Sequence, residues 1–181
     1  MSTARDIHNL ALIGFMGTGK SSVGQLVAAQ LHFRFVDTDE LVEARAGKTI
    51  TAIFAEEGES RFREHERAVV EELRNFHRVV IATGGGLATQ EANLASLKTH
   101  ALVVCLWASP ETIWERVSHQ SHRPLLQTPD PLAKIRQLLS EREPFYRKAD
   151  VLVSTELRSV KEVVQHVIHQ FRLERGQPLH R

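Results

Sequence analysis

One glycine-rich segment constrains the fold of this chain more than any other feature. Residues 14–21 follow the pattern G-x-x-x-x-G-K-[ST], directly after the apolar residues 10–13 and directly before the helical pattern of residues 22–31. Glycines there let successive backbone amides point inward, and the following helix N-terminus adds partial positive charge. The segment therefore predicts a phosphate-binding loop in which Lys20 reaches terminal phosphates and the Ser21 hydroxyl ligates Mg²⁺. The alternative is a glycine-rich turn that only caps a helix.

The apolar residues before this loop are predicted to form a strand, and further apolar runs follow along the chain. The predicted strands cover residues 8–13, 33–36, 79–82, 101–107 and 151–154, and helical patterns separate them. Helix starts are marked at Ser109, Asp130 and Ser159, where a cap oxygen is followed by a proline or by a glutamate three residues on. Strands that alternate with helices predict an α/β fold with a mostly parallel sheet covered on both faces. Ligands of such sheets bind beyond the carboxyl ends of the strands.

Two stretches interrupt this alternation. Residues 39–75 are too long for one connecting helix and are predicted to form two or three helices, broken near Gly47 and Gly58. We interpret them as a substrate-binding insertion. Residues 118–129 are polar, contain two prolines and have no hydrophobic period, which favours a mobile lid. The chain length of 181 residues accommodates both within a single domain.

Composition argues against several kinds of partner. The chain has 23 Lys and Arg residues and 22 Asp and Glu residues, so its formal charge of +1 supplies no bulk field for nucleic acid or an acidic membrane. The longest apolar run, residues 101–108, is far shorter than the ~20 residues of a membrane span, and residues 1–9 lack a signal-peptide core. The single cysteine, Cys105, cannot form an internal disulfide. We therefore expect a cytoplasmic protein without nucleic-acid or membrane partners, and a monomer.

Carboxylates are expected after the second strand. The strand of residues 79–82 runs into Thr83 and three glycines, without the aspartate that many phosphate-loop enzymes place there. Asp37 and Asp39 follow the second strand instead; Asp37 can orient a water of the metal, and Asp39 can accept a hydroxyl proton or hold acceptor hydroxyls. An ordinary helix N-cap is the alternative, and the two roles are compatible. No N/T-K-x-D sequence marks a guanine pocket, so ATP is the expected donor.

Arginines and glycines predict a pocket for a small anion. Arg61 and Arg63 point about 200° apart on a helix, so only one of them can face a pocket, and Arg142 is a further candidate. A guanidinium group suits a carboxylate, although a surface salt bridge is the alternative for each arginine. Residues 84–86 are glycines that follow a strand, where their backbone can approach a ligand or form a tight turn. On the nucleotide side, Arg123 in the predicted lid can close over phosphates.

Together these motifs resemble those of the shikimate kinase family over residues 9–171. The motifs are, in order, residues 14–21, Asp37-Thr38-Asp39, Gly58-Glu59 with Phe62-Arg63, Gly84-Gly85-Gly86, Arg123-Pro124-Leu125-Leu126, and Arg142 with Pro144 and Tyr146. The resemblance implies one three-layer α/β P-loop kinase domain over residues 1–181, with a five-stranded parallel sheet in the order 2-3-1-4-5, a substrate-binding subdomain at about residues 39–75 and a lid at about 118–129. It also implies transfer of the γ-phosphoryl group of ATP to the 3-hydroxyl of shikimate, with Mg²⁺, in chorismate and aromatic amino acid biosynthesis.

The resemblance further implies a role for each site residue. ATP would be bound by Gly17, Thr18, Gly19, Lys20, Ser21, Ser22, Arg116 and Arg123. Shikimate would be bound by Asp39, Arg63, Gly85, Gly86 and Arg142, with the two arginines on its carboxylate. Ser21 would ligate Mg²⁺, and Asp37 would act through a water. Catalysis would fall to Lys20, Asp39 and Arg123, with Arg116 packed on the adenine.

Two other functions fit part of these observations. One is a kinase of the same fold that acts on gluconate or a nucleotide, which would need different acceptor contacts. The other is a nucleotide-binding module that senses shikimate-like acids without turnover. A sensor need not keep the set of Lys20, Ser21, Asp37, Asp39 and Arg123, which serves transfer chemistry.

Overall fold

The computed structural model describes residues 5–119 and 128–176. Its strands are β1 (Asn9–Ile13), β2 (Arg34–Asp37), β3 (Val79–Ala82), β4 (Ala101–Trp107) and β5 (Val151–Ser154). In this part of the chain they form a five-stranded parallel sheet in the order β2-β3-β1-β4-β5. The predicted α/β class and strand order are confirmed.

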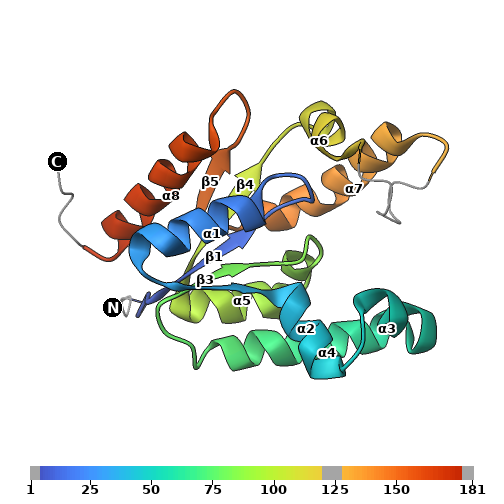
Figure 1. Ribbon diagram of the computed structural model, residues 1–181, viewed down its shortest axis with the longest axis horizontal. Coiled ribbons are helices and arrows are strands. Elements are labelled where there is room, and N and C mark those ends of the chain that lie inside the picture. Colours follow the sequence, from blue (N-terminus) through green and yellow to red (C-terminus); the bar gives the residue numbers. More distant parts are fainter. Residues whose placement is uncertain (1–4, 120–127, 177–181) are drawn as a thin grey trace.

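Helices cover both faces of this sheet (Figure 1). They are α1 (Lys20–Leu31), α2 (Thr38–Ala46), α3 (Ile50–Glu56), α4 (Gly58–Leu73), α5 (Glu91–His100), α6 (Pro110–Val117), α7 (Pro131–Tyr146) and α8 (Val160–Glu174), with a short 3₁₀ helix η1 (Leu87–Thr89). Leu10 and Leu12 of β1 pack with α1 and α8, whereas Ala11 and Ile13 pack with α4, α5 and α7. All four side chains are fully buried, as expected for a central parallel strand.

The predicted helix starts are confirmed. Ser109, Asp130 and Ser159 each accept a hydrogen bond from the backbone N–H three residues further on. Ser159 and Glu162 also form a complete capping box at the start of α8. None of the helices in the described ranges has the combined length and apolar character needed to cross a bilayer.

Three strand boundaries differ from the prediction, two in β2 and one in β1. Phe33 lies outside β2, because its N–H donates to Ala28 O at the end of α1. β2 instead runs on to Asp37, which pairs with Ala82 of β3. β1 begins at Asn9 and not at His8. The carboxylate of Asp37 therefore stands at the carboxyl end of a strand, on the edge where ligands of such sheets bind.

The segment between β2 and β3 contains three helices, as predicted. Gly47 ends α2 and Gly58 begins α4, with φ values of 68° and 82°, a left-handed conformation that glycine adopts without steric strain. The ring of Phe54 on α3 lies 4.8 Å from that of Phe62 on α4, measured between centroids. These helices project from one side of the sheet (Figure 1). Their function as a substrate-binding subdomain stays a prediction.

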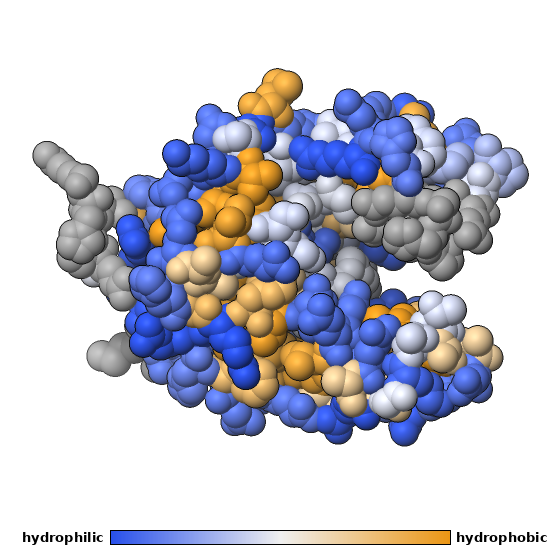
Figure 2. All heavy atoms as spheres, viewed as in Figure 1, coloured by the Kyte–Doolittle hydropathy of each residue, from blue (hydrophilic) through white to orange (hydrophobic). Residues whose placement is uncertain are grey.

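The surface is hollowed on one side of the molecule. Figure 2 shows this hollow between the part that α2, α3 and α4 form and the part that α6 and α7 form. The carboxyl ends of β1 and β3 point toward this side (Figure 1). Residues 120–127 of the predicted lid, with Arg123, lie outside the described residues.

Candidate active site

The loop between β1 and α1 needs glycine for both conformation and space. Gly14, Gly17 and Gly19 have φ values of 137°, 75° and 91°. A Cβ atom at Gly14 would lie 2.3 Å from the carbonyl oxygen of Leu106, and one at Gly17 would lie 2.7 Å from a methyl group of Val117. Larger residues are thus excluded from both positions. The loop passes tightly over the end of β4 and over α6, which holds it in one shape.

Lys20 begins α1 and is held inside this loop. Its Nζ atom donates to Gly14 O at 2.9 Å and to Phe15 O at 2.8 Å, and the residue is only 9% exposed. The Thr18 hydroxyl also donates to Phe15 O, at 2.8 Å. A buried ammonium thus lies beside a helix N-terminus, and both attract the oxygens of a phosphate.

A pocket of about 400 Å³ lies over the loop. Its lining residues are Met16, Gly17, Gly19, Lys20, Ser21, Ser22, Asp37, Asp39, Thr83, Gly84, Gly85, Arg116 and Val117. Most of them come from the loop after β1, the end of β2 and the turn after β3, three strand ends that a parallel sheet places together, and Arg116 and Val117 come from α6. The pocket therefore brings several predicted nucleotide-side residues together with two predicted acceptor-side residues, Asp39 and Gly85.

Asp37 both caps a helix and faces Ser21. One carboxylate oxygen accepts a hydrogen bond of 2.9 Å from Asp39 N and so caps α2. The other oxygen lies 3.5 Å from the Ser21 hydroxyl. Hydroxyl and carboxylate oxygens are the ligands that Mg²⁺ prefers, and this ion commonly takes one or two protein groups and completes its shell with phosphates and water. The two side chains therefore fit the predicted cation.

Asp39 lies where the pocket meets the turn after β3. Burial raises the pKa of Asp39 to about 6. The charges of Asp37 and Glu66 act in the same direction, and Lys20 opposes them. A Cβ atom at Gly84 would lie 2.5 Å from Asp39 Oδ1, so glycine is required for this approach. A carboxylate with a pKa near neutrality can accept a proton from an acceptor hydroxyl.

Arg63 and Arg142 reach the glycines after β3 from different helices. Arg63 extends from α4, and its Nη2 atom lies 3.0 Å from the position of a Cβ at Gly86. Arg142 extends from α7, and its Nη1 atom lies 3.4 Å from the corresponding position at Gly85. Two guanidinium groups beside half-buried glycine peptides form an arrangement that suits a carboxylate.

Arg61 lies on a different side of α4, as its spacing from Arg63 predicts. Its side chain is 50% exposed and pairs with Glu57 at 3.3 Å and with Glu64 at 2.5 Å. Arg61 therefore forms surface salt bridges, which is the alternative interpretation given above for each arginine. Nothing in this position connects Arg61 with the pocket.

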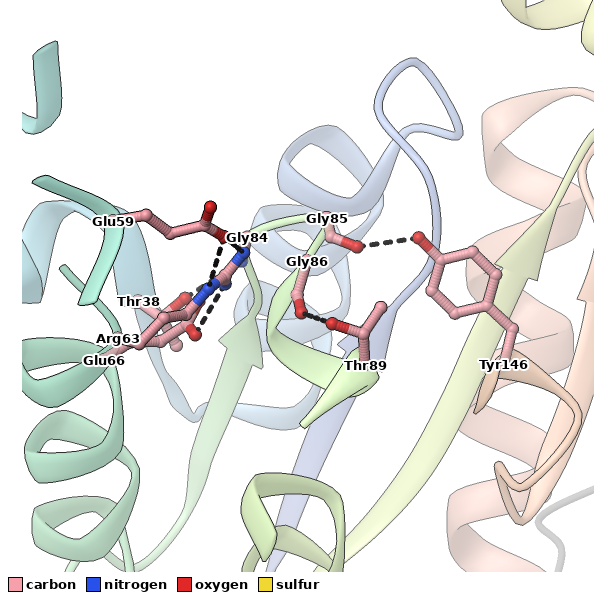
Figure 3. Close-up of polar contacts among 9 residues, drawn as sticks. All are labelled: Thr38, Glu59, Arg63, Glu66, Gly84, Gly85, Gly86, Thr89 and Tyr146. Carbon is pink, nitrogen blue, oxygen red and sulfur yellow. Dashed lines mark hydrogen bonds and ion pairs between the residues drawn. The ribbon is translucent and has the colours of Figure 1, made fainter. Parts of the chain in front are cut away.

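Glu66 is a site residue that the sequence reasoning missed. Its carboxylate is 2% exposed and accepts a hydrogen bond of 2.9 Å from Arg63 Nη1, while Glu59 pairs with the same guanidinium at 3.2 Å (Figure 3). Burial raises the pKa of Glu66, and the charge of Arg63 opposes this effect. The two carboxylates hold Arg63 in place. The i, i+3 spacing of Arg63 and Glu66 on one helix is the signal that could have identified it.

Arg116 joins the phosphate loop to the end of β5. Its guanidinium donates to Gly17 O at 3.2 Å, to Thr155 Oγ1 at 2.9 Å and to Thr155 O at 2.9 Å. A second pocket of about 220 Å³ lies here, lined by Gly17, Thr18, Gly19, Ser22, Val23, Arg116, Thr155, Arg158, Val160 and Val163. It shares residues with the first pocket, so a ligand can extend from one to the other. Thr155, Arg158 and Val160 thereby become candidates in a segment where the sequence indicated no contact.

Comparisons with known proteins agree with this arrangement. A family model described as shikimate kinase matches residues 16–172. A curated shikimate kinase from Caldanaerobacter subterraneus subsp. tengcongensis is 44% identical over 165 residues, which cover 91% of this chain and 96% of that protein. The solved shikimate kinase from Acinetobacter baumannii in complex with shikimate is 37% identical, with a TM-score of 0.86 and coverage of 96% of this chain and 97% of that one. A gluconokinase structure from Sinorhizobium meliloti, 20% identical with a TM-score of 0.65 and coverage of 95% and 96%, shares the fold alone. The chain belongs to the shikimate kinase family.

Proposed function

We propose that this chain transfers the γ-phosphoryl group of ATP to the 3-hydroxyl of shikimate and releases shikimate 3-phosphate and ADP. One observation carries the proposal: Lys20 and Asp39 line one pocket, and Arg63 and Arg142 flank the glycine turn at its edge. A phosphate cradle and a carboxylate-binding group thus lie within reach of one small molecule. Membership of the shikimate kinase family supports the same acceptor.

On the donor side, the loop amides and Lys20 hold the phosphates. The ammonium of Lys20 meets the charge on the transferring oxygens, and Ser21 with Asp37 would hold the cation. When bound, Mg²⁺ offsets the charge of the β- and γ-phosphates. Arg116 and the second pocket would receive the adenine, since that pocket adjoins the phosphate loop. Arg123 of the lid would complete the phosphate contacts.

On the acceptor side, the residues position one hydroxyl against the γ-phosphorus. Arg63 and Arg142 would bind the carboxylate of shikimate, and the Gly85 and Gly86 backbone would complete that contact. Asp39 would hold the ring hydroxyls and accept the proton of the attacking one. With its pKa near 6, Asp39 is ionised at neutral pH and ready for this role. Positioning accounts for much of the expected rate acceleration.

The proposal extends to the setting of the enzyme. Residues 39–75 would form the substrate-binding subdomain, and residues 118–129 would form a lid that excludes water from the transfer. A monomer in the cytoplasm, without nucleic-acid or membrane partners, agrees with the near-neutral charge and with Cys105, a buried free thiol.

A coupled assay of ADP release tests this function. Turnover is expected with shikimate and not with gluconate or AMP as acceptor, because shikimate holds its carboxylate and hydroxyls on one rigid ring, whereas gluconate is an open chain and AMP has no carboxylate. Lys20→Met should abolish turnover, since it removes the charge that meets the transferring phosphoryl group, while circular dichroism shows an intact fold. Turnover with gluconate or AMP alone would assign another acceptor, and ligand binding without any ADP release would indicate a sensor.

A further inference from the structure

The turn after β3 contains a central peptide, between Gly85 and Gly86, whose orientation is not fixed by a backbone hydrogen bond of its own. Leu87 N donates to Gly84 O at 3.1 Å, so residues 84–87 form a β-turn. Gly86 has φ −96° and ψ −10°, the values of the third residue of a type I turn. A type II turn differs by a flip of the central peptide and needs positive φ at this third residue, which glycine allows without steric cost. The Gly85–Gly86 peptide is therefore free to adopt either orientation unless another group restrains it.

The hydroxyl of Tyr146 provides such a restraint. It donates to Gly85 O at 2.7 Å, and the ring lies on the opposite side of the turn from Arg63 (Figure 3). Tyr146 is the last residue of α7, is 1% exposed and belongs to the main hydrophobic core. Burial raises the pKa of Tyr146 to about 12, so the hydroxyl keeps its proton and acts as a donor at neutral pH.

The orientation of this peptide determines where an amide of the pocket points. Carbonyl and N–H of a trans peptide point in opposite directions. With Gly85 O held toward Tyr146, the Gly86 N–H is directed away from α7, on the side where Arg63 approaches. Among residues 5–119 and 128–176, this N–H has no hydrogen-bond acceptor. It is thus available to a ligand that Arg63 also binds.

We propose that Tyr146 is a positioning residue whose hydroxyl keeps the Gly85–Gly86 peptide in its type I orientation and so aims the Gly86 N–H at the acceptor carboxylate. This inference rests on the carboxylate pocket of the proposed function. Arg142 lies four residues before Tyr146 on the same helix. The last turn of α7 therefore supplies a cation to the carboxylate and also orients a neutral donor toward it.

The next peptide of the turn offers a matched control. Gly86 O accepts a hydrogen bond of 2.6 Å from the Thr89 hydroxyl and a second one of 3.1 Å from Thr89 N (Figure 3). The backbone bond remains when the hydroxyl is removed. Gly85 O, in contrast, is held by a side chain. The hydroxyl of Thr89 is therefore dispensable for orientation, whereas that of Tyr146 is not.

Steady-state kinetics of Tyr146→Phe and Thr89→Val test the inference. Tyr146→Phe keeps the ring and should raise KM for shikimate about twofold to tenfold, the effect of one hydrogen bond, with kcat and KM for ATP unchanged. Thr89→Val should leave all three constants unchanged, although it too loses a hydroxyl that donates to a carbonyl of this turn. Thermal unfolding of both variants checks that they fold. An unchanged KM for shikimate in folded Tyr146→Phe, or an equal rise in Thr89→Val, overturns the proposal.

A double variant distinguishes an effect of Tyr146 on the peptide from an effect through Arg142. The distinction is needed because the Tyr146 hydroxyl also lies within hydrogen-bonding reach of that guanidinium. If Tyr146 acts on the peptide, Tyr146→Phe raises KM for shikimate again in an Arg142→Ala background. If the additional rise disappears, Tyr146 acts through Arg142 and the inference is wrong. Should Arg142→Ala alone leave KM for shikimate unchanged, the pocket itself is misassigned, so that failure is distinct from failure of the peptide restraint.

Discussion

Among single residues, Asp39 shows a conflict between stability and function. Burial and neighbouring carboxylates raise the pKa of Asp39 from 3.8 to about 6. The folded pKa thus lies above the unfolded one, so the fold favours the protonated form. This stabilising contribution is complete below pH 3.8 and is lost as the pH rises through about 6. At neutral pH the ionised carboxylate destabilises the fold, yet that form is the one a base requires.

Asp39→Asn is therefore expected to stabilise the protein while it abolishes turnover. The neutral side chain avoids the burial of a charge, so the free energy of unfolding should rise by up to about 3 kcal/mol at pH 8, with a smaller gain at pH 5. Urea unfolding at both pH values measures this. Glu40→Gln, an exposed carboxylate next in sequence, is the control and should change neither property. A less stable Asn variant at pH 8 would contradict the role of burial.

Among elements, the amino ends of the strands carry a group of imidazoles at the opposite end of the sheet from the pocket. His8 precedes β1, His77 precedes β3 and His100 ends α5. The rings of His8 and His77 stack at 4.1 Å, and that of His100 lies 6.0 Å from His8. Asn9 Nδ2 lies 3.0 Å from His100 Nδ1. The group ties two strands and a helix together through stacked rings.

Acid is expected to weaken this junction. Burial lowers the pKa of His100 from 6.5 to about 4, and the charges of His8 and Arg74 act in the same direction. Because the folded pKa lies below the unfolded one, the contribution is present above pH 6.5 and is lost as the pH falls toward 4. When the pH falls from 7 to 5, the free energy of unfolding should therefore drop by about 1 to 2 kcal/mol less in His100→Gln than in the wild type. Urea unfolding at both pH values measures this difference. His169→Gln, an exposed histidine on α8, should follow the wild type; an identical pH slope in His100→Gln would refute the effect.

The elements were predictable where local chemistry decides them. Ser109, Asp130 and Ser159 are helix caps because each bonds an N–H three residues away, which a short window of sequence contains. The end of β2 was not predictable in this way. Asp37 belongs to the strand because it pairs with Ala82, a residue far along the chain.

For the whole molecule, predictability falls where distant elements meet. Lys20 and Ser21 belong to one continuous motif, so their neighbourhood follows from sequence. The choice of Arg63 and Arg142 came from the family resemblance, since no local pattern shows that α4 and α7 both reach the turn after β3. The contact between Tyr146 and this turn likewise depends on the placement of α7, and the sequence motif that contains Tyr146 does not show it.

Ligand-induced stabilisation is expected to distinguish the residues that bind shikimate from those that bind the nucleotide. A ligand at about 100 times its Kd raises the free energy of unfolding by about 2.7 kcal/mol. Arg63→Ala should weaken shikimate binding roughly tenfold to a hundredfold and so remove about half or more of the shikimate-induced rise in Tm, because a charge-assisted contact is lost. The rise caused by ADP should persist, since Lys20 is untouched.

Scanning calorimetry measures both increments in each variant. Arg61→Ala, on the same helix but paired at the surface, is the matched control and should keep the shikimate increment and the ADP increment. A full shikimate increment in Arg63→Ala, or loss of the ADP increment there, would contradict the assignment.

Lys20 has a consequence for the entropy of phosphate binding. Its ammonium donates to two carbonyls of its own loop, so the folded chain already holds this side chain in place. A lysine that is ordered in advance loses little rotamer entropy when a ligand arrives. The entropic cost of ordering Lys20 therefore falls on folding and not on nucleotide binding.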